Sequence, residues 1–411
     1  MEVTVKSKNL GQKKPPTIRY VTPWYVEYGF YASLAYGLMG PVVGIEIDRL
    51  GILILGILAC FCFLSIGERP VDFFKTLIFP IGLGVSYLII QMMYHGISVQ
   101  QDYVKMFIPW ILTLIVVQAL SFRRGFLHRF VIFALLLGGF MMFFIDIKEY
   151  GTEGITRLAL EKGAGLSNSN ALADWFGFCA VYMYMYGVVA ERQEIRLVAW
   201  MLSTGCLLVV TLTVSRGALL AILIAIVLGS REILKRGFLP LLILFLLVWV
   251  AYGVGLFDQA LKFYTMRATE ESGRFLVWPR AFEGFLSAPF TGVGANNVNI
   301  FVPQAAKYVT PHNGILFLAM ASGIIPLLFY MAYWIQTGWA ALCAPNGKIK
   351  TASFYLPLVA YAFLVCLSSN VAFMNSWVVV TLAATMRSHI QIQPPSPRIV
   401  RDKKFKKGSF R

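Results

Sequence analysis

Apolar segments long enough to cross a bilayer recur along this chain, and short polar stretches separate them. A membrane-spanning helix needs about 20 predominantly apolar residues. About twelve segments approach this length, and the eighth is short enough that we expect it to extend into its flanks: 25–45, 50–66, 72–93, 104–121, 126–146, 169–190, 197–214, 217–229, 238–257, 313–335, 352–370 and 374–390. The pattern predicts an all-α polytopic membrane protein.

The composition agrees with this pattern. Hydrophobic residues make up 58% of the chain, charged residues 14%, and the mean hydropathy is +0.69. A water-soluble protein of 411 residues could not bury so much apolar surface. The net charge of +16 does not indicate nucleic-acid binding, because Lys and Arg cluster in the tails and short loops. That distribution is the one that membrane topology favours.

The same charges predict the orientation of the chain. If the N-terminus is cytoplasmic, an even number of spans returns the C-terminus to the cytoplasm, and most Lys and Arg then lie inside. We expect a basic tail over 1–24, a transmembrane domain over 25–390 and a second basic tail over 391–411. The first tail has no cleavage site after a short apolar core, so we expect no cleaved signal peptide. A large outward-facing loop, about 258–312, separates the ninth span from the tenth.

Several kinds of site have no signature in the sequence. The six cysteines lie in or beside apolar segments and none lies in the long loop, so we expect neither a disulfide framework nor a metal cluster. There is no P-loop, and the outer loops have no Asp-x-Asp pair to hold a divalent cation on a diphosphate. We therefore expect no metal and no cofactor, and any phosphate group would have to be bound by arginine.

Arg216, in the stretch "VSRGA", lies between two apolar segments at an outward-facing turn. An arginine close to membrane depth is costly and usually has a partner. One interpretation is a side chain that reaches up to lipid headgroups from a tight turn. The other is a fixed cation for a phosphate-bearing ligand, to which guanidinium offers two parallel hydrogen bonds.

The segment from Glu271 to Asn297 predicts an amphipathic helix on the membrane surface, since Arg274, Trp278 and Phe285 belong to a set with helical spacing. Pro279 either bends this helix or begins a second piece. Arg274 and Arg280 face the protein interior in one interpretation, and are solvated anchors in the other.

His312 and Asn313 begin the tenth span. A lone histidine beside an apolar face is more often a hydrogen-bonded structural group, and Asn313 suits a helix cap as well as a substrate ligand. The two outward arginine sites favour a functional His312, because histidine is the side chain that takes up protons near neutral pH.

Asn168, Asn170 and Asp174 open the sixth span, in "GLSNSNALADWFGF". The asparagines suit helix capping or substrate binding. Asp174 lies about one turn inside the apolar region, where an ionisable group is either functional or part of a structural ion pair.

Taken together, "SRGALL", "GRFLVW", "APFTGVGANN" and "PHNGILFLAMASGIIP", in this order, resemble the O-antigen ligase and polymerase superfamily of bacterial inner-membrane glycosyltransferases. "NSNALA" is similar to a further element of that family, with Ser169 where proline is common. The resemblance implies about twelve helices, a large periplasmic loop late in the chain and a periplasmic active site.

The resemblance also implies a reaction. A glycan carried on undecaprenyl diphosphate is transferred, without metal and with inversion, to an acceptor hydroxyl. The family's essential histidine corresponds to His312 and its arginines to Arg216 and Arg274. Arg280 is a further candidate for the diphosphate, and membrane lipids surround the enzyme.

Three acceptors stay open: lipid A–core for a ligase, another lipid-linked glycan for a polymerase, and a protein side chain for a protein O-oligosaccharyltransferase. We favour the ligase, because the chain is compact and shows no extra soluble domain. A lipid-linked glycan flippase or transporter is the alternative from another class, but the costly polar groups gather on the outer side and no paired halves are visible. A structural scaffold would explain none of the arginine and histidine placement.

Overall fold

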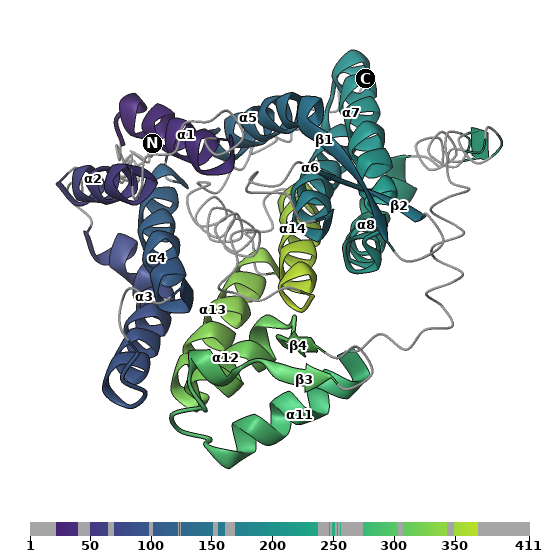
Figure 1. Ribbon diagram of the computed structural model, residues 1–411. Coiled ribbons are helices and arrows are strands. Elements are labelled where there is room, and N and C mark those ends of the chain that lie inside the picture. Colours follow the sequence, from purple (N-terminus) through teal and green to yellow (C-terminus); the bar gives the residue numbers. More distant parts are fainter. Residues whose placement is uncertain are drawn as a thin grey trace, which may run out of the picture.

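The computed structural model describes residues 22–39, 50–64, 70–97, 102–121, 123, 125–150, 155–160, 169–236, five isolated positions between 246 and 255, 274–302, 307–342 and 349–368. Most of this part of the chain is helical (Figure 1). Its longer helices are α1 (Trp24–Met39), α2 (Leu50–Leu64), α3 (Pro70–Met93), α4 (Asp102–Ser121), α5 (Phe126–Met141), α6 (Ser169–Val189), α7 (Gln193–Leu212), α8 (Arg216–Arg236), α11 (Arg274–Ser287), α12 (Gly314–Ser322), α13 (Ile324–Leu342) and α14 (Ile349–Cys366). Two 3₁₀ turns, η1 (Met142–Phe144) and η2 (Ala295–Asn297), complete the helical elements.

Three helical segments among the described residues are long and apolar enough to cross a membrane: Phe126–Phe144, Ser169–Val189 and Gln193–Leu212. Shorter apolar stretches lie in α2, α3, α4, α8 and α14. The prediction of a mostly helical protein with membrane-spanning segments is confirmed to this extent, and the number of about twelve spans stays a prediction. The predicted span 374–390 lies outside the described residues, and so does the span 238–257 apart from the isolated positions.

α6 forms the centre of the bundle. It packs against α5, α7, α8 and α14, and every residue from Ala171 to Met185 is buried. Polar side chains in neighbouring helices tie the bundle together through backbone carbonyls: the indole Nε1 of Trp175 donates to the Ala134 carbonyl at 3.0 Å, and the Ser203 hydroxyl donates to the Ala180 carbonyl at 2.8 Å. A helix that is apolar on all sides belongs in the interior of a bundle.

The outward faces of the peripheral helices are apolar. Leu220, Leu223 and Val227 are exposed on one face of α8, and Ile325, Leu328, Ile335 and Trp339 on one face of α13. Spacing of three, four and seven residues places such side chains on one stripe of a helix. Continuous exposed stripes of this kind are suited to lipid rather than water.

Two antiparallel hairpins interrupt the all-α pattern. β1 (Ile145–Tyr150) pairs with β2 (Ile155–Leu160), with Ile145 opposite Leu160, in a region predicted to be the end of a span and a loop. β3 (Ile300–Val302) pairs with β4 (Lys307–Val309) inside the predicted periplasmic loop. The first four residues of β1, "IDIK", alternate apolar and polar side chains, which is the strand period, and helix formation ends at η1.

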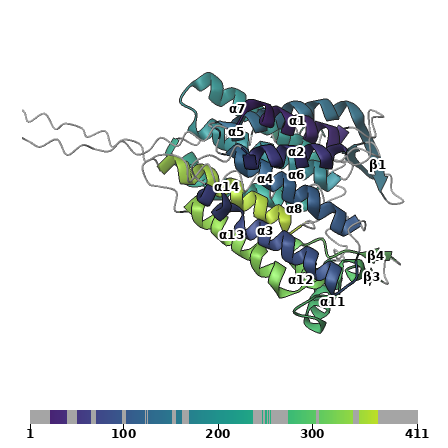
Figure 2. The ribbon, with the colours of Figure 1, turned by 90° about the vertical axis from the view of Figure 1, so that its left-hand side faces the viewer.

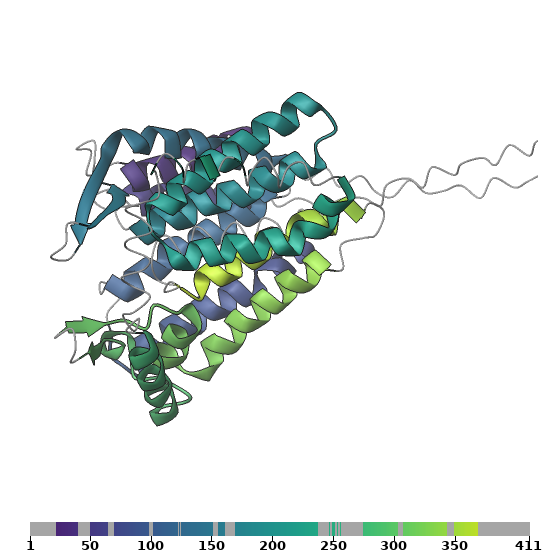
Figure 3. The ribbon, with the colours of Figure 1, turned by 90° about the vertical axis from the view of Figure 1, so that its right-hand side faces the viewer.

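All four strands, together with α11, lie at one end of the bundle, as the two side views show (Figures 2 and 3). We call this the strand end, and the other the opposite end. α5 runs toward the strand end because β1 follows it directly, and α6 runs away from it because β2 packs on α6. Short turns reverse the chain after α6 and α7, so α8 also begins at the strand end.

The predicted tenth span, 313–335, is two helices. Gly323 separates α12 from α13 with φ of +76°, a conformation that favours glycine. A Cβ at this position would lie 2.3 Å from the carbonyl oxygen of Phe290. The prediction of a single helix was therefore wrong, because the segment 289–294 packs against the point where the helix breaks. The predicted extension of the eighth span is confirmed, since α8 reaches from Arg216 to Arg236.

Candidate active site

The predicted site residues that the structure describes lie at the strand end, where α6, α8, α11 and α12 begin. Asn170 and Asp174 lie in the first turns of α6, and Arg216 is the first residue of α8. Arg274 is the first residue of α11, and His312 and Asn313 directly precede α12. α14 packs against α6 and α8 on one side and α13 on the other. Helix N-termini carry partial positive charge, so this end of the bundle suits an anionic ligand.

His312 occupies an unusual backbone conformation. Its φ is +48°, the left-handed region that non-glycine residues rarely adopt, and its side chain is exposed. Asn313 follows as the N-cap of α12: its Oδ1 accepts hydrogen bonds from the backbone N–H groups of Ile315 (3.0 Å) and Leu316 (3.2 Å). The capping interpretation of Asn313 is thus observed directly. The turn presents the imidazole at the mouth of α12.

A tryptophan on α11 holds the residue before His312. The indole Nε1 of Trp278 donates to the backbone carbonyl of Pro311 at 3.0 Å. Pro311 is buried, so its carbonyl needs a hydrogen-bond partner. The sequence placed Trp278 on the amphipathic helix but did not show this contact.

Arg216 is exposed at the start of α8, immediately after a turn built like that of His312. Val214, two residues before it, has φ of +54° and a buried side chain. The following residue, Gly217, lies where a Cβ would come within 3.1 Å of the Ser368 side chain beyond α14. The glycine of "SRG" therefore serves close helix packing, and the arginine is the residue that the turn presents at the strand end.

The remaining candidate residues differ in burial and in hydrogen-bond partners. Asp174 is buried and its backbone carbonyl accepts a hydrogen bond from the Tyr361 hydroxyl at 3.1 Å, while Asn170 is half-buried one turn earlier. The exposed Arg280 donates from Nη1 to the backbone carbonyl of Phe301 at 2.7 Å, which joins α11 to β3. Asn168 and the side chain of Arg274 lie outside the described residues.

α11 is one continuous helix, with Pro279 inside it rather than at a break. Val277 and Ala281 are buried against the protein. The exposed side divides into an apolar stripe containing Phe282 and Leu286 and a polar stripe containing Arg280 and Glu283. The amphipathic helix predicted from the sequence is confirmed, and the interpretation of Pro279 as the start of a second piece was wrong.

The segment "PFTGVG", residues 289–294, is hydrogen-bonded to the chain around the break between α12 and α13. The backbone N–H of Val293 donates to Met320, and that of Ile324 donates to Pro289, both at 2.8 Å. Gly292 leaves no room for a Cβ, which would lie 2.4 Å from the Ser322 nitrogen. Gly292 therefore allows backbone to pack on backbone, and Gly294 leaves room for the His95 ring.

Two side chains near the end of α3 also hydrogen-bond this part of the chain. Gln91, fully buried, donates from Nε2 to the Ala321 carbonyl and accepts at Oε1 from the Ala295 N–H, both at 2.8 Å. His95 Nε2 lies 2.9 Å from the Thr291 carbonyl oxygen. The sequence analysis missed both, because their partners are backbone groups about 200 residues away, and no sequence pattern marks such pairs.

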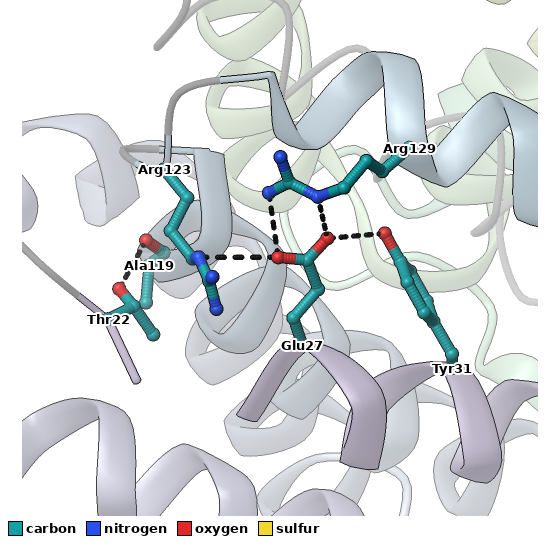
Figure 4. Close-up of polar contacts among 6 residues, drawn as sticks. All are labelled: Thr22, Glu27, Tyr31, Ala119, Arg123 and Arg129. Carbon is teal, nitrogen blue, oxygen red and sulfur yellow. Dashed lines mark hydrogen bonds and ion pairs between the residues drawn. The ribbon is translucent and has the colours of Figure 1, made fainter. Parts of the chain in front are cut away.

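A second charged cluster, which the sequence analysis also missed, lies where α1 and α5 begin, at the opposite end, and Figure 4 shows its residues. Glu27 of α1 accepts hydrogen bonds from Arg129 of α5 at Nε (2.7 Å) and Nη2 (2.8 Å), and from the Tyr31 hydroxyl (2.8 Å). Arg123 Nε lies 3.3 Å from the same carboxylate. The buried Glu27 carboxylate thus ties α1 to the turn between α4 and α5. The only indication of this cluster in the sequence is Glu27, a lone acidic residue near the start of the first apolar segment.

Within the described ranges, no group of three or more His, Cys, Asp or Glu side chains comes together in a way that could hold a metal ion. The prediction of a metal-free site stays a prediction.

Residues 197–331 match the family model described as O-antigen ligase. The matched segment begins in α7 and ends within α13, and it includes Arg216, Arg274, Arg280, His312 and Asn313. Asn168, Asn170 and Asp174 lie before it. No curated protein matches the chain. The match confirms the resemblance that the motifs showed, and the part of this membrane protein that presents Arg216 and His312 belongs to the O-antigen ligase family.

Proposed function

We propose that this protein is an inverting, metal-independent glycosyltransferase that moves a glycan from undecaprenyl diphosphate to an acceptor hydroxyl. The observation that carries the proposal is the position of Arg216 and His312. Both lie within the O-antigen ligase match and at the strand end of the bundle, where Arg216 is the first residue of α8 and His312 lies two residues before α12. We place this end on the periplasmic side, as the charge distribution predicts.

Arg216 and Arg274 suit the diphosphate of the donor. When the bond between the sugar and the diphosphate breaks, negative charge grows on the leaving phosphate. Guanidinium groups stabilise that charge through paired hydrogen bonds, and the N-terminal ends of α8 and α11 add to the positive potential. Stabilisation that increases as charge develops lowers the barrier itself. We assign Arg280 a lesser role, because it is already bonded to β3.

His312 is the residue that we assign to the acceptor hydroxyl, as its general base. Its imidazole takes the proton from the acceptor hydroxyl while the hydroxyl oxygen attacks the anomeric carbon. The new glycosidic bond forms on the face opposite the diphosphate, the old bond breaks, and undecaprenyl diphosphate leaves with the bonding electrons. The anomeric configuration is therefore inverted. The exposed apolar stripe of α11, with Phe282 and Leu286, would lie in the membrane surface beside the donor lipid.

We propose lipid A–core as the acceptor, in keeping with the description of the matched family as a ligase. Lipid-linked glycan and protein acceptors are tested in parallel. Transfer to either of these, with none to lipid A–core, would replace the ligase with a polymerase or a protein O-oligosaccharyltransferase.

The experiment is a transfer assay with the purified protein in lipid nanodiscs, undecaprenyl-diphosphate glycan and lipid A–core, with EDTA throughout. We expect product with the inverted linkage. His312→Ala should lower kcat by about 10²–10⁴-fold, as loss of a general base does. Arg216→Ala should lower it by about 10²–10³-fold, as loss of a charge-stabilising group does.

Arg192→Ala is the matched control, because Arg192 is an exposed arginine directly before α7, at the opposite end. It should keep wild-type kcat. Full activity of His312→Ala would remove the base from the mechanism, and a strict need for Mg²⁺ would contradict the metal-free reaction. Movement of the donor lipid across the membrane without any new glycosidic bond would indicate a flippase.

A further inference from the structure

The backbone around His312 is held on both sides. The peptide unit between Pro311 and His312 is planar and rigid, so the Pro311 carbonyl and the His312 nitrogen turn as one body. Trp278 fixes the carbonyl end of that unit through its 3.0 Å hydrogen bond. On the other side, the cap formed by Asn313 anchors the following residue to the first turn of α12.

His312 therefore sits between two fixed points, and its φ of +48° is the rotation that joins them. A residue with a Cβ does not keep this conformation unless its surroundings enforce it. If the Pro311 carbonyl were released, the peptide unit could rotate toward negative φ. The direction of the Cα–Cβ bond, and with it the position of the imidazole, would change.

Trp278 is well placed to enforce the conformation. It lies on α11 between buried Val277 and the ring of Pro279, and α11 packs against α12. Its own ring is half-buried, so the indole is fixed by packing as well as by the hydrogen bond.

We propose that Trp278 is a positioning residue that sets the orientation of the His312 imidazole through the Pro311 carbonyl. The catalytic consequence rests on the proposed function, in which His312 is the base. A base displaced from the acceptor hydroxyl transfers the proton poorly even when the substrates bind normally. Loss of the indole N–H should therefore lower kcat and leave the donor KM unchanged.

The test compares Trp278→Phe with Trp175→Phe. Each removes an indole donor that bonds a backbone carbonyl at 3.0 Å, but Trp175 does so between α6 and α5, inside the bundle. We expect Trp278→Phe to lower kcat by about 10- to 100-fold with donor KM near the wild-type value. Trp175→Phe should lose thermal stability and keep kcat. If Trp278→Phe does not fold, Trp278→Met, a flexible apolar side chain that also lacks the N–H donor, serves in its place with the same expected result.

A second measurement is independent of glycosyl transfer. Diethyl pyrocarbonate modifies accessible imidazoles, and mass spectrometry gives the rate at His312, with His128 at the opposite end as internal reference. We expect the relative rate at His312 to change in Trp278→Phe and to stay constant in Trp175→Phe.

Unchanged kcat and unchanged modification in Trp278→Phe would overturn the proposal. So would equal losses of kcat in both variants, which would mean that the indole bond only stabilises the fold. If the wild-type protein transfers no glycan but the His312 modification rate still changes in Trp278→Phe, the proposed function fails while the positioning role stands.

Discussion

At the residue scale, the two motifs share one local construction. Val214 and His312 are the non-glycine residues with positive φ in the described part of the chain, and each stands two residues before the first residue of a helix. For a residue with a Cβ this conformation costs about 1–2 kcal/mol. Such strain persists only where packing enforces it, and it concentrates at functional sites. The buried Val214 side chain holds one turn, and Trp278 and Asn313 hold the other.

Asn313 provides the first prediction, since capping and ligand binding make different demands on its side chain. Asn313→Ala removes the Oδ1 acceptor and should lower the free energy of unfolding by about 1 kcal/mol. Asn313→Ser keeps a capping oxygen and should retain both wild-type stability and kcat. Thermal unfolding and the transfer assay measure the two effects. Normal stability of Asn313→Ser with kcat reduced as far as in His312→Ala would mean that the amide also binds substrate.

At the scale of elements, the strand end depends on close contact between backbone segments. α12 is only nine residues long, and an isolated helix of this length is marginal. Segment 289–294 on one side and α3 on the other hold it in place. The break at Gly323 allows that contact, because the Phe290 carbonyl occupies the position where a side chain would begin.

Gly323→Ala should therefore be strongly destabilising. The variant adds a Cβ at φ of +76° and 2.3 Å from the Phe290 oxygen, so we expect a loss of about 3 kcal/mol from backbone strain and overpacking together. The control is Gly205→Ala in α7, where a Cβ meets nothing within 4 Å. There alanine should be neutral or stabilising, by up to about 1 kcal/mol. Equal unfolding midpoints for the two variants would contradict the packing described for 289–294.

The Glu27 cluster provides the prediction for the opposite end. Glu27→Ala leaves Arg123 and Arg129 without their shared carboxylate, and breaking a buried pair costs about 3–5 kcal/mol. Since 42% of the Arg129 side chain is exposed, solvent reduces this to about 2 kcal/mol. The measurement is the unfolding midpoint in mixed micelles. Glu194→Ala, at an exposed acid in the first turn of α7, should change the midpoint little.

The Glu27 cluster lies far along the bundle from His312. We therefore expect kcat of Glu27→Ala to stay near the wild-type value at a temperature where the variant is folded. A large fall in kcat would indicate coupling between the two ends.

At the scale of the whole molecule, the hydropathy pattern located the helices well. The second, third, fourth and sixth spans agree with α2, α3, α4 and α6 to within two residues. Their apolar faces repeat over many residues, and lipid and core select the same residue types. The break at Gly323 was hidden because "MASGIIP" stays apolar on both sides of it. It is set by a contact with residues 289–294, which hydropathy does not encode.

The candidate site was predictable only in part, for a related reason. Arg216 and His312 stood out because charged or titratable side chains are costly at the edge of a membrane segment. The residues that fix the backbone on either side of α12 did not stand out. Trp278 and Gln91 act through backbone carbonyls and an N–H group far away in sequence, and tryptophan and glutamine in these positions look like ordinary helix residues. Long-range polar contacts of this kind depend on the tertiary fold.

The orientation of the bundle is a prediction at the same scale. We expect Ser287→Cys, on the exposed side of α11, to react with a membrane-impermeant maleimide in intact cells. Glu191→Cys, in the exposed turn between α6 and α7, should react only after the membrane is permeabilised. Each is compared with the wild-type protein to account for its own cysteines. The reverse pattern would place the strand end in the cytoplasm and exclude a periplasmic active site.

The hydrogen bonds of Gln91 bear on how this protein could be divided or recombined. Gln91 lies outside the family match, yet its side chain satisfies one backbone N–H and one carbonyl within the matched segment. If residues 197–331 were moved into another protein, both groups would be left buried without a partner, at a cost of about 1–3 kcal/mol each. The segment that matches the family, residues 197–331, therefore does not contain all the side chains that its own buried backbone groups need. A chimera that keeps its site intact must carry the end of α3 along with the motifs.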